Sequence, residues 1–179
     1  MASLEEIRAA RLKKLAQLRK GGHDPYPSKV PRDLSLADLR AEFSELEKAK
    51  KTLAVAGRIM AIRGGGAIQF VVLNDGGTTF QAVFKKDILG DDAMAQFGAT
   101  ADIGDFIGVS GELFVTTRGE ESVLVKSWTM AAKSLRPLPE KWHGLQDPDE
   151  KLRQRYLDIM FDDELRTLFV KKSKFWNAI

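Results

Sequence analysis

The stretch LAVAGRIMAIRGGGAIQFVVLNDGGTTFQAVF, residues 53–84, decides the fold of this chain. It holds three runs of apolar and β-branched residues that are typical of β-strands: residues 53–63, 67–73 and 78–84. A glycine triplet at residues 64–66 and an Asn-Asp-Gly-Gly cluster at residues 74–77 separate the runs. Glycine adopts positive φ angles at little cost, so each cluster can reverse the chain. The stretch therefore predicts three consecutive strands.

Two more strand-like runs follow, at residues 106–116 and 122–130, joined by a turn at residues 117–120. A segment with helical character, residues 87–97, precedes them. The order strand, strand, strand, helix, strand, strand is that of an OB-fold, a closed barrel that binds single-stranded nucleic acids or sugars. We predict a mainly β chain: a five-stranded OB-fold barrel with flanking helices.

Helices are predicted on both sides of the barrel. Ser3 and Glu6 form a capping box for a helix that ends near Lys20, and Ser35 caps a second helix with one apolar face. After the barrel, Asp147 followed by proline starts a helix over residues 149–160, and Asp162 or Asp163 starts another. The predicted division is residues 1–52, a helical extension; 53–133, the barrel; 134–160, a linker; and 161–179, the start of a further domain.

Composition places limits on the function. Of 179 residues, 44% are hydrophobic and 30% charged, as in ordinary soluble chains, and no apolar run reaches the roughly 20 residues of a membrane span. The absence of cysteine excludes disulfides and thiolate metal sites, and fits a reducing compartment such as the cytoplasm. With only two histidines, His23 and His143, far apart in the sequence, we expect no metal site.

The net charge of +3 is unevenly distributed. Residues 1–52 carry 12 basic against 8 acidic side chains, whereas residues 53–132 carry 6 against 9. A general electrostatic binder of nucleic acids usually has its basic patch on the binding domain. If this barrel binds nucleic acid, we expect stacking and base-edge contacts there, with phosphate contacts from the flanks. Candidates on the first helix are Arg8, Arg11, Lys14 and Arg19, although a solvated helix face is the alternative.

Strand parity identifies candidate binding residues. Phe80, Ala82 and Phe84 share one face of the third strand; if they fill the barrel, Gln81 points outward, where its amide can read a base edge. In the second strand both faces are apolar, so Phe70 is either core or an exposed stacking platform, and the pattern alone favours the core.

Motifs of catalysis are missing from the sequence. The glycine triplet is not a phosphate-binding loop, because no Gly-Lys-Ser/Thr follows and a strand comes next. There is no Gly-x-Ser-x-Gly, no His-Glu-x-x-His and no cysteine nucleophile. We therefore predict no catalytic residues and no cofactor in this chain, and interpret it as a binding domain followed by the start of a larger one.

The segment LRPLPEKWHGLQDPDEKLRQRYLDI, residues 135–159, closely resembles the linker of bacterial class II lysyl-tRNA synthetases. The basic first helix, the second helix and the strand order are similar to the N-terminal region of the same enzymes, so the resemblance covers essentially the whole chain. Aspartyl and asparaginyl enzymes share the barrel but not the P-L-P-x-K-[FW]-H-G-L motif. The last helix, residues 165–179, resembles the start of motif 1, the dimer-interface element.

The resemblance implies a function and a set of residues. The barrel would bind the anticodon of tRNA-Lys, with Arg63, Phe70 and Gln81 recognising the central uridine and Glu120 (or Glu121) a neighbouring base. The parent enzyme, a cytoplasmic homodimer, would use ATP and Mg²⁺ to attach lysine to its tRNA. Motifs 2 and 3, which bind ATP and lysine, are not in this chain. Three features depart from the family: residues 64–67 lack a common lysine, Thr78-Thr79 stand where the turn before the third strand often carries an arginine, and Leu152 stands in a usual tyrosine place.

Two other functions remain open from the sequence. One is a stand-alone OB-fold nucleic-acid-binding protein or tRNA chaperone without enzymatic activity, ending naturally near Ile179. The other is a scaffold that has lost RNA binding. The apolar pattern of the last helix runs to Ile179 without a C-cap, so we expect the chain to be part of a longer protein. Alone, the 179 residues are expected to be mostly monomeric and catalytically inactive.

Overall fold

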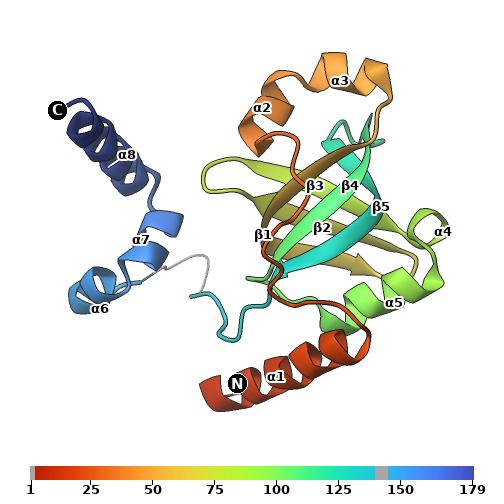
Figure 1. Cartoon of the computed structure of the whole chain (residues 1–179), viewed down its shortest axis with the longest axis horizontal. Coiled ribbons are helices and arrows are strands. Elements are labelled where there is room, and N and C mark those ends of the chain that lie inside the picture. Colours follow the sequence, from red (N-terminus) through yellow and green to blue (C-terminus); the bar gives the residue numbers. More distant parts are fainter. Residues whose placement is uncertain (1–2, 140–144) are drawn as a thin grey trace. The chain divides into compact units, whose positions relative to one another are not determined.

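The computed structural model describes residues 3–139 and 145–179 (Figure 1). The chain forms two compact units, Met1–Pro137 and Leu138–Ile179, and each is described by itself. Part of the linker motif, residues 140–144 with His143, lies outside the described residues.

The first unit is built on a closed barrel of five strands in the order β1-β2-β3-β5-β4. All neighbouring strands are antiparallel except β3 and β5, which run parallel. This architecture confirms the predicted five-stranded OB-fold. The strands are β1 (Leu53–Gly65), β2 (Ile68–Asn74), β3 (Thr79–Lys85), β4 (Phe106–Val115) and β5 (Glu121–Ala132).

The long strand β1 closes the barrel because it pairs with two partners. Its first half, from Leu53 to Arg58, pairs with β4, and its second half, from Arg58 to Gly65, pairs with β2. An irregularity between Ile59 and Ala61 bends the strand between the two halves. A second irregularity in β4 falls at Gly111, where an added Cβ would lie 2.0 Å from the Leu124 carbonyl oxygen. Only glycine allows this close approach of β4 and β5.

Phenylalanines fill the barrel, which is the condition on which the predicted outward direction of Gln81 depends. Phe80 and Phe84 are 2% and 0% exposed. Phe84 stacks on Phe97 with ring centroids 4.2 Å apart, and Trp128 meets Phe97 edge-on at 5.2 Å. Phe97 belongs to α5 (Asp91–Thr100), which lies between the barrel and α1 (Leu4–Lys20) at the lower end of the barrel in Figure 1. Helices α2 (Leu36–Ala41) and α3 (Phe43–Ala49) cover the opposite end.

Three helices predicted as continuous are each divided in the structure. The second N-terminal helix breaks at Glu42, whose φ and ψ of −103° and 10° are not helical, and Phe43 then packs on Phe80. The segment between β3 and β4 forms α4 (Lys86–Leu89) and α5, separated by Gly90 at φ 89°. The helix expected over residues 149–160 breaks at Gln154 into α6 (Pro148–Arg153) and α7 (Arg155–Phe161).

The last helix, α8 (Asp163–Asn177), begins after Asp162, whose carboxylate accepts a hydrogen bond from the Leu165 amide at 2.8 Å. Asp162 is thus the cap, one of the two residues that the sequence offered. In the described part of the chain, no helix is long and apolar enough to cross a membrane.

A buried ion cluster, which we call the Lys133 cluster, joins the two ends of the first unit. The Lys133 ammonium is fully buried and donates to three oxygens: the Thr100 carbonyl at 2.7 Å, Asp102 at 2.6 Å and Asp105 at 2.7 Å. The Asp105 carboxylate, also fully buried, accepts from the amides of Asp102 and Ser134 as well. Every proton of the ammonium therefore has an acceptor.

Helix α1 is fixed to this cluster by two side chains. Lys14 donates to the second carboxylate oxygen of Asp102 at 2.6 Å. The buried guanidinium of Arg11 donates to the carbonyls of Ser134, Arg136 and Ile103, at 2.9–3.0 Å. Residues 133–137 thus pack with the barrel and α1, so the first unit extends to Pro137, past the predicted barrel boundary at residue 133.

Replacing Lys133 with alanine should lower the free energy of unfolding of the first unit by about 3–5 kcal/mol, because the buried Asp105 loses its counter-ion. Urea denaturation followed by circular dichroism measures the change. The control is Lys126→Ala, which removes a half-exposed ion pair with Glu112 and should cost less than about 1 kcal/mol. Equal effects of the two variants would contradict the central role of the cluster.

The free energy of unfolding should also fall in acid, because Asp102 becomes protonated there. Burial by itself raises the pKa of Asp102, but the hydrogen bonds and positive charges of Lys133 and Lys14 outweigh burial and hold this pKa below its ordinary 3.8. Because the folded protein then binds fewer protons than the unfolded chain, the contribution is full above pH 3.8 and is lost as the pH falls through the lower folded value. Asp102→Asn should flatten this acid limb in urea denaturation at stepped pH; an unchanged limb would refute the assignment.

Candidate nucleic-acid interface

The outer face of the barrel carries two rows of side chains that cross the strands side by side. One row runs from Arg63 (β1) through Phe70 (β2) and Val83 (β3) to Leu124 (β5) and Glu112 (β4). The neighbouring row holds Ala61, Val72, Gln81, Ser122 and Phe114. Because side chains alternate along a strand, both rows face away from the core. Three of the four residues that the resemblance singled out lie in these rows: Arg63 and Phe70 are in the first row, and Gln81 is in the second.

Arg63 and Phe70 are directly opposite each other in the β1–β2 pair. Their neighbours Val71 and Leu73 are 0% and 1% exposed and belong to the core, so Phe70 points outward and is half-buried. The preference of the strand pattern for a core Phe70 is therefore wrong. Arg63 is exposed beside it, so a planar ring and a guanidinium are presented together. This pair can stack a base and donate to its edge.

Gln81 faces outward, as parity predicted, but it is only 8% exposed. Its Nε2 donates to the Ser122 hydroxyl at 2.8 Å, and that hydroxyl donates to the Glu120 carbonyl at 3.2 Å. No residue that the structure describes donates to Gln81 Oε1, and this oxygen keeps contact with solvent. The hydrogen bond to Ser122 therefore holds the amide of Gln81 in one orientation and leaves its Oε1 as an acceptor.

Glu120 lies in the turn between β4 and β5. Its amide donates to the Thr116 hydroxyl at 3.0 Å and its carbonyl accepts from the Thr116 amide, so the turn is closed on itself. The carboxylate of Glu120 is exposed, while Glu121 is half-buried as the first residue of β5. Ser122 links the backbone of Glu120 to Gln81, so the turn and β3 are positioned together.

The four basic candidates of α1 have different surroundings. Arg8 and Arg19 are exposed and remain candidate phosphate contacts. Arg11 requires a correction: it is 7% exposed, and its guanidinium is bound to three carbonyls, so it holds the helix in place and does not face RNA. Lys14 forms an ion pair with Asp102, and this pairing neutralises much of the positive charge that Lys14 would otherwise present at the surface.

Several outer-face residues were not predicted from the sequence. Phe114 of β4 is half-buried in the row of Gln81, and the Lys85 ammonium lies 6.0 Å from the centre of its ring. Leu124 of β5 is half-buried opposite Glu112 of β4, and Glu112 forms an ion pair with Lys126. Strand parity could have predicted that Phe114 faces outward, because its neighbour Leu113 faces the core. Both residues are apolar, however, so the sequence has no polar residue here that marks the outer face.

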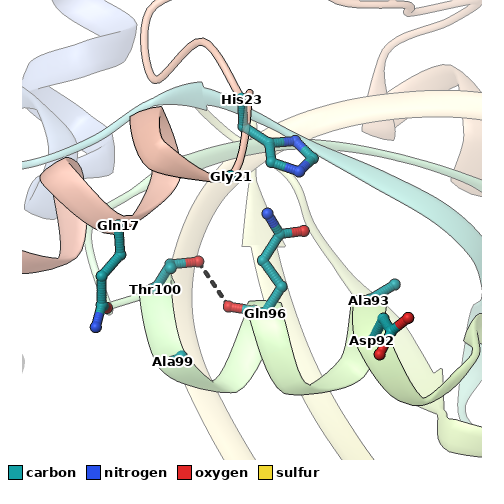
Figure 2. Close-up of a pocket in the computed structure, with 8 residues that line it drawn as sticks. All are labelled: Gln17, Gly21, His23, Asp92, Ala93, Gln96, Ala99 and Thr100. Atoms are coloured by element: carbon teal, nitrogen blue, oxygen red, sulfur yellow. Dashed lines mark hydrogen bonds between the residues drawn. The ribbon is translucent and has the colours of Figure 1, made fainter.

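A hollow lies between α1 and α5 (Figure 2). The side chains of Gln17, His23 and Gln96 surround it, and Ala93 and Ala99 form part of its wall. It is open to solvent and combines amides with the exposed carboxylate of Asp92. Nothing in its chemistry singles out a ligand class. Within residues 3–139 and 145–179, no group of three or more His, Cys, Asp or Glu side chains is arranged to hold a metal.

Known proteins identify the kind of barrel. Residues 53–138 match the family described as OB-fold nucleic acid binding domain, which coincides with the five strands and the Lys133 cluster. The outer face of the barrel thus lies within the stretch that matches a nucleic-acid-binding domain.

The chain as a whole is similar to the lysine–tRNA ligases of several bacteria. It is 44% identical over 177 residues to the enzyme of Clostridium perfringens, which is 98% of this chain and 35% of that protein. It is 41% identical to the enzymes of Syntrophomonas wolfei and Listeria monocytogenes, over 96% and 92% of this chain and 34% of each relative. The chain thus spans about a third of the length of these relatives, and the predicted resemblance is confirmed.

Separate roles are expected for the arginines of α1. Arg11→Ala should lower the free energy of unfolding by about 2 kcal/mol or more, since three carbonyls lose a charged donor, without changing the RNA affinity of the folded protein. Arg19→Ala should leave stability unchanged but reduce the slope of log affinity against log salt, by about 0.7 for a phosphate contact to single-stranded RNA. Urea denaturation and salt-dependent fluorescence anisotropy measure both. Weakened RNA binding by a fully stable Arg11→Ala variant would reverse the assignment.

Proposed function

We propose that the barrel binds the anticodon of tRNA-Lys and that Phe70, Arg63 and Gln81 recognise its central uridine. The observation that supports this most is their grouping: a half-buried ring, an exposed guanidinium beside it and a fixed amide oxygen lie on the outer face of an OB-fold nucleic-acid-binding domain. The similarity of nearly the whole chain to lysine–tRNA ligases supports the choice of tRNA.

Each side chain has a physical role in this proposal. Phe70 stacks on the unpaired uracil, and such stacking contributes roughly 1–3 kcal/mol per base. Uracil presents two carbonyl acceptors and one N–H donor. Gln81 Oε1, fixed through Ser122, accepts from the N–H, and Arg63 donates to a carbonyl. Cytosine lacks that N–H at the same ring position, so a site built on an acceptor there rejects it. Glu120 accepts from a neighbouring base.

Phosphate contacts come from outside the acidic barrel in this proposal. The exposed residues Arg8 and Arg19 of α1 supply them, since α1 is held against the barrel by Arg11 and Lys14. A sequence-independent electrostatic contribution from the helix then adds to base readout by the barrel.

For the longer protein we propose a class II lysine–tRNA ligase, a cytoplasmic homodimer that uses ATP and Mg²⁺ to attach lysine to tRNA. The similarity to the relatives, which are about three times as long, supports this. The present chain contributes tRNA recognition without catalysis and is monomeric by itself. A stand-alone OB-fold binding protein or tRNA chaperone is the alternative, and it would bind without a preference for the lysine anticodon.

The test is binding of this chain to an anticodon stem-loop with UUU, compared with loops whose central U is C or G. We expect at least about tenfold weaker binding to the changed loops, as expected for a lost hydrogen bond to a polar site. Phe70→Ala should abolish the preference while the fold, checked by circular dichroism, is kept. Phe169→Ala, an exposed phenylalanine of α8, is the matched control. Equal, salt-sensitive binding to every loop would reject the proposed function.

A further inference from the structure

Phe114 is a second aromatic ring on the outer face of the barrel, three strands away from Phe70. It pairs with Ser122, and Ser122 pairs with Gln81, so Phe114 lies two strand spacings, about 10 Å, from the proposed uracil-reading amide. The ring is half-buried. A base stacked on it would therefore be a neighbour of the base at Phe70 and not the same one.

A cation accompanies this ring. The Lys85 ammonium lies 6.0 Å from the ring centre of Phe114, at the outer limit of a cation–π contact. Lys85 pairs with Ile68 across β2 and β3, so it is on the outer face as well. Lys126 on the same face is paired with Glu112, whereas none of the ion pairs among the described residues includes Lys85. Lys85 is thus a basic side chain beside Phe114 whose charge is available to a phosphate, as the exposed Arg63 is beside Phe70.

An apolar path connects the two rings. Val83 lies beside Phe70, and the half-buried Leu124 lies beside Val83. Val83 itself is only 1% exposed, so the surface that a single strand can meet between the two rings is that of the half-buried Leu124, and this apolar surface suits stacked bases. The barrel as a whole is acidic, so one available lysine beside a ring is a local exception.

We propose that Phe114 and Lys85 form a second nucleotide-binding position, which takes an unpaired nucleotide flanking the one at Phe70. Phe114 stacks on its base, and Lys85 contacts the adjoining phosphate. The position rests on the proposed function, because it is defined relative to the base at Phe70. It extends the RNA surface from the β1–β3 side across to β4.

The test is a mutant cycle between protein and RNA. The chain and its Phe114→Ala variant are titrated with the UUU stem-loop and with loops in which the first or the third anticodon nucleotide is abasic. We expect Phe114→Ala to weaken binding of the intact loop roughly 5- to 10-fold. It should have no effect on the loop that lacks the base stacked there. Lys85→Gln should reduce the salt slope by about 0.7.

Phe114→Leu separates stacking from apolar packing beside Ser122, its partner across β4 and β5, because leucine keeps an apolar side chain there but offers no flat ring. It should bind as weakly as Phe114→Ala. An equal loss for Phe114→Ala on all three loops, or full rescue by leucine, would mean that the ring only supports Gln81 and would overturn the proposal. No loss, with Phe70→Ala still impaired, overturns the second position alone. If Phe70→Ala is also without effect, the proposed function has failed as well.

Discussion

One buried ammonium group, that of Lys133, holds the N-terminal helix, the barrel and the start of the linker together. Removing a lysine and two carboxylates from water costs several kcal/mol, which is recovered only if every partner is in place. Here Thr100, Asp102 and Asp105 supply the three acceptors, and Arg11 and Lys14 extend the network to α1. A partly formed cluster would leave a charge buried without a partner. The arrangement of α1 on the barrel is therefore specified, and with it the direction in which Arg19 is presented.

The outer face depends on the inner one. Phe80 and Phe84 fill the barrel, and this fixes β3 so that Gln81 can only point outward. A shift of one residue in the register would exchange the two faces. The parallel pair of β3 and β5 then brings Ser122 to Gln81 and restrains its amide. The arrangement of Gln81 and Ser122 on the outer face is thus a consequence of the packing beneath it, and in the proposed function these polar groups need little further organisation to meet a base.

The barrel was predictable because glycine turns and strand parity are local signals. Gln81 could be placed outside since its neighbours Phe80 and Ala82 are apolar and it is not. Phe70 could not, because both faces of β2 are apolar and burial there depends on which face lines the interior of the barrel. The role of Arg11 was predicted wrongly for a related reason. The three carbonyls that it binds belong to residues 92 to 125 positions later in the sequence, and no local pattern indicates such distant partners. The helix break at Glu42 likewise precedes a contact with a residue distant in the sequence, that of Phe43 with Phe80.

The parallel pairing of β3 and β5 also has a consequence for how the chain is made. Gln81 and Ser122 are 41 residues apart, so at a synthesis rate of about 5–20 residues per second the second follows the first by roughly two to eight seconds. Lys133, which locks the barrel to α1, comes later still. While it is being made, the growing chain exposes Phe70 and an unpaired edge of β3 without a finished barrel. A ribosome-bound chain can complete the outer face around Gln81 only in one late step, when β5 arrives and closes the barrel.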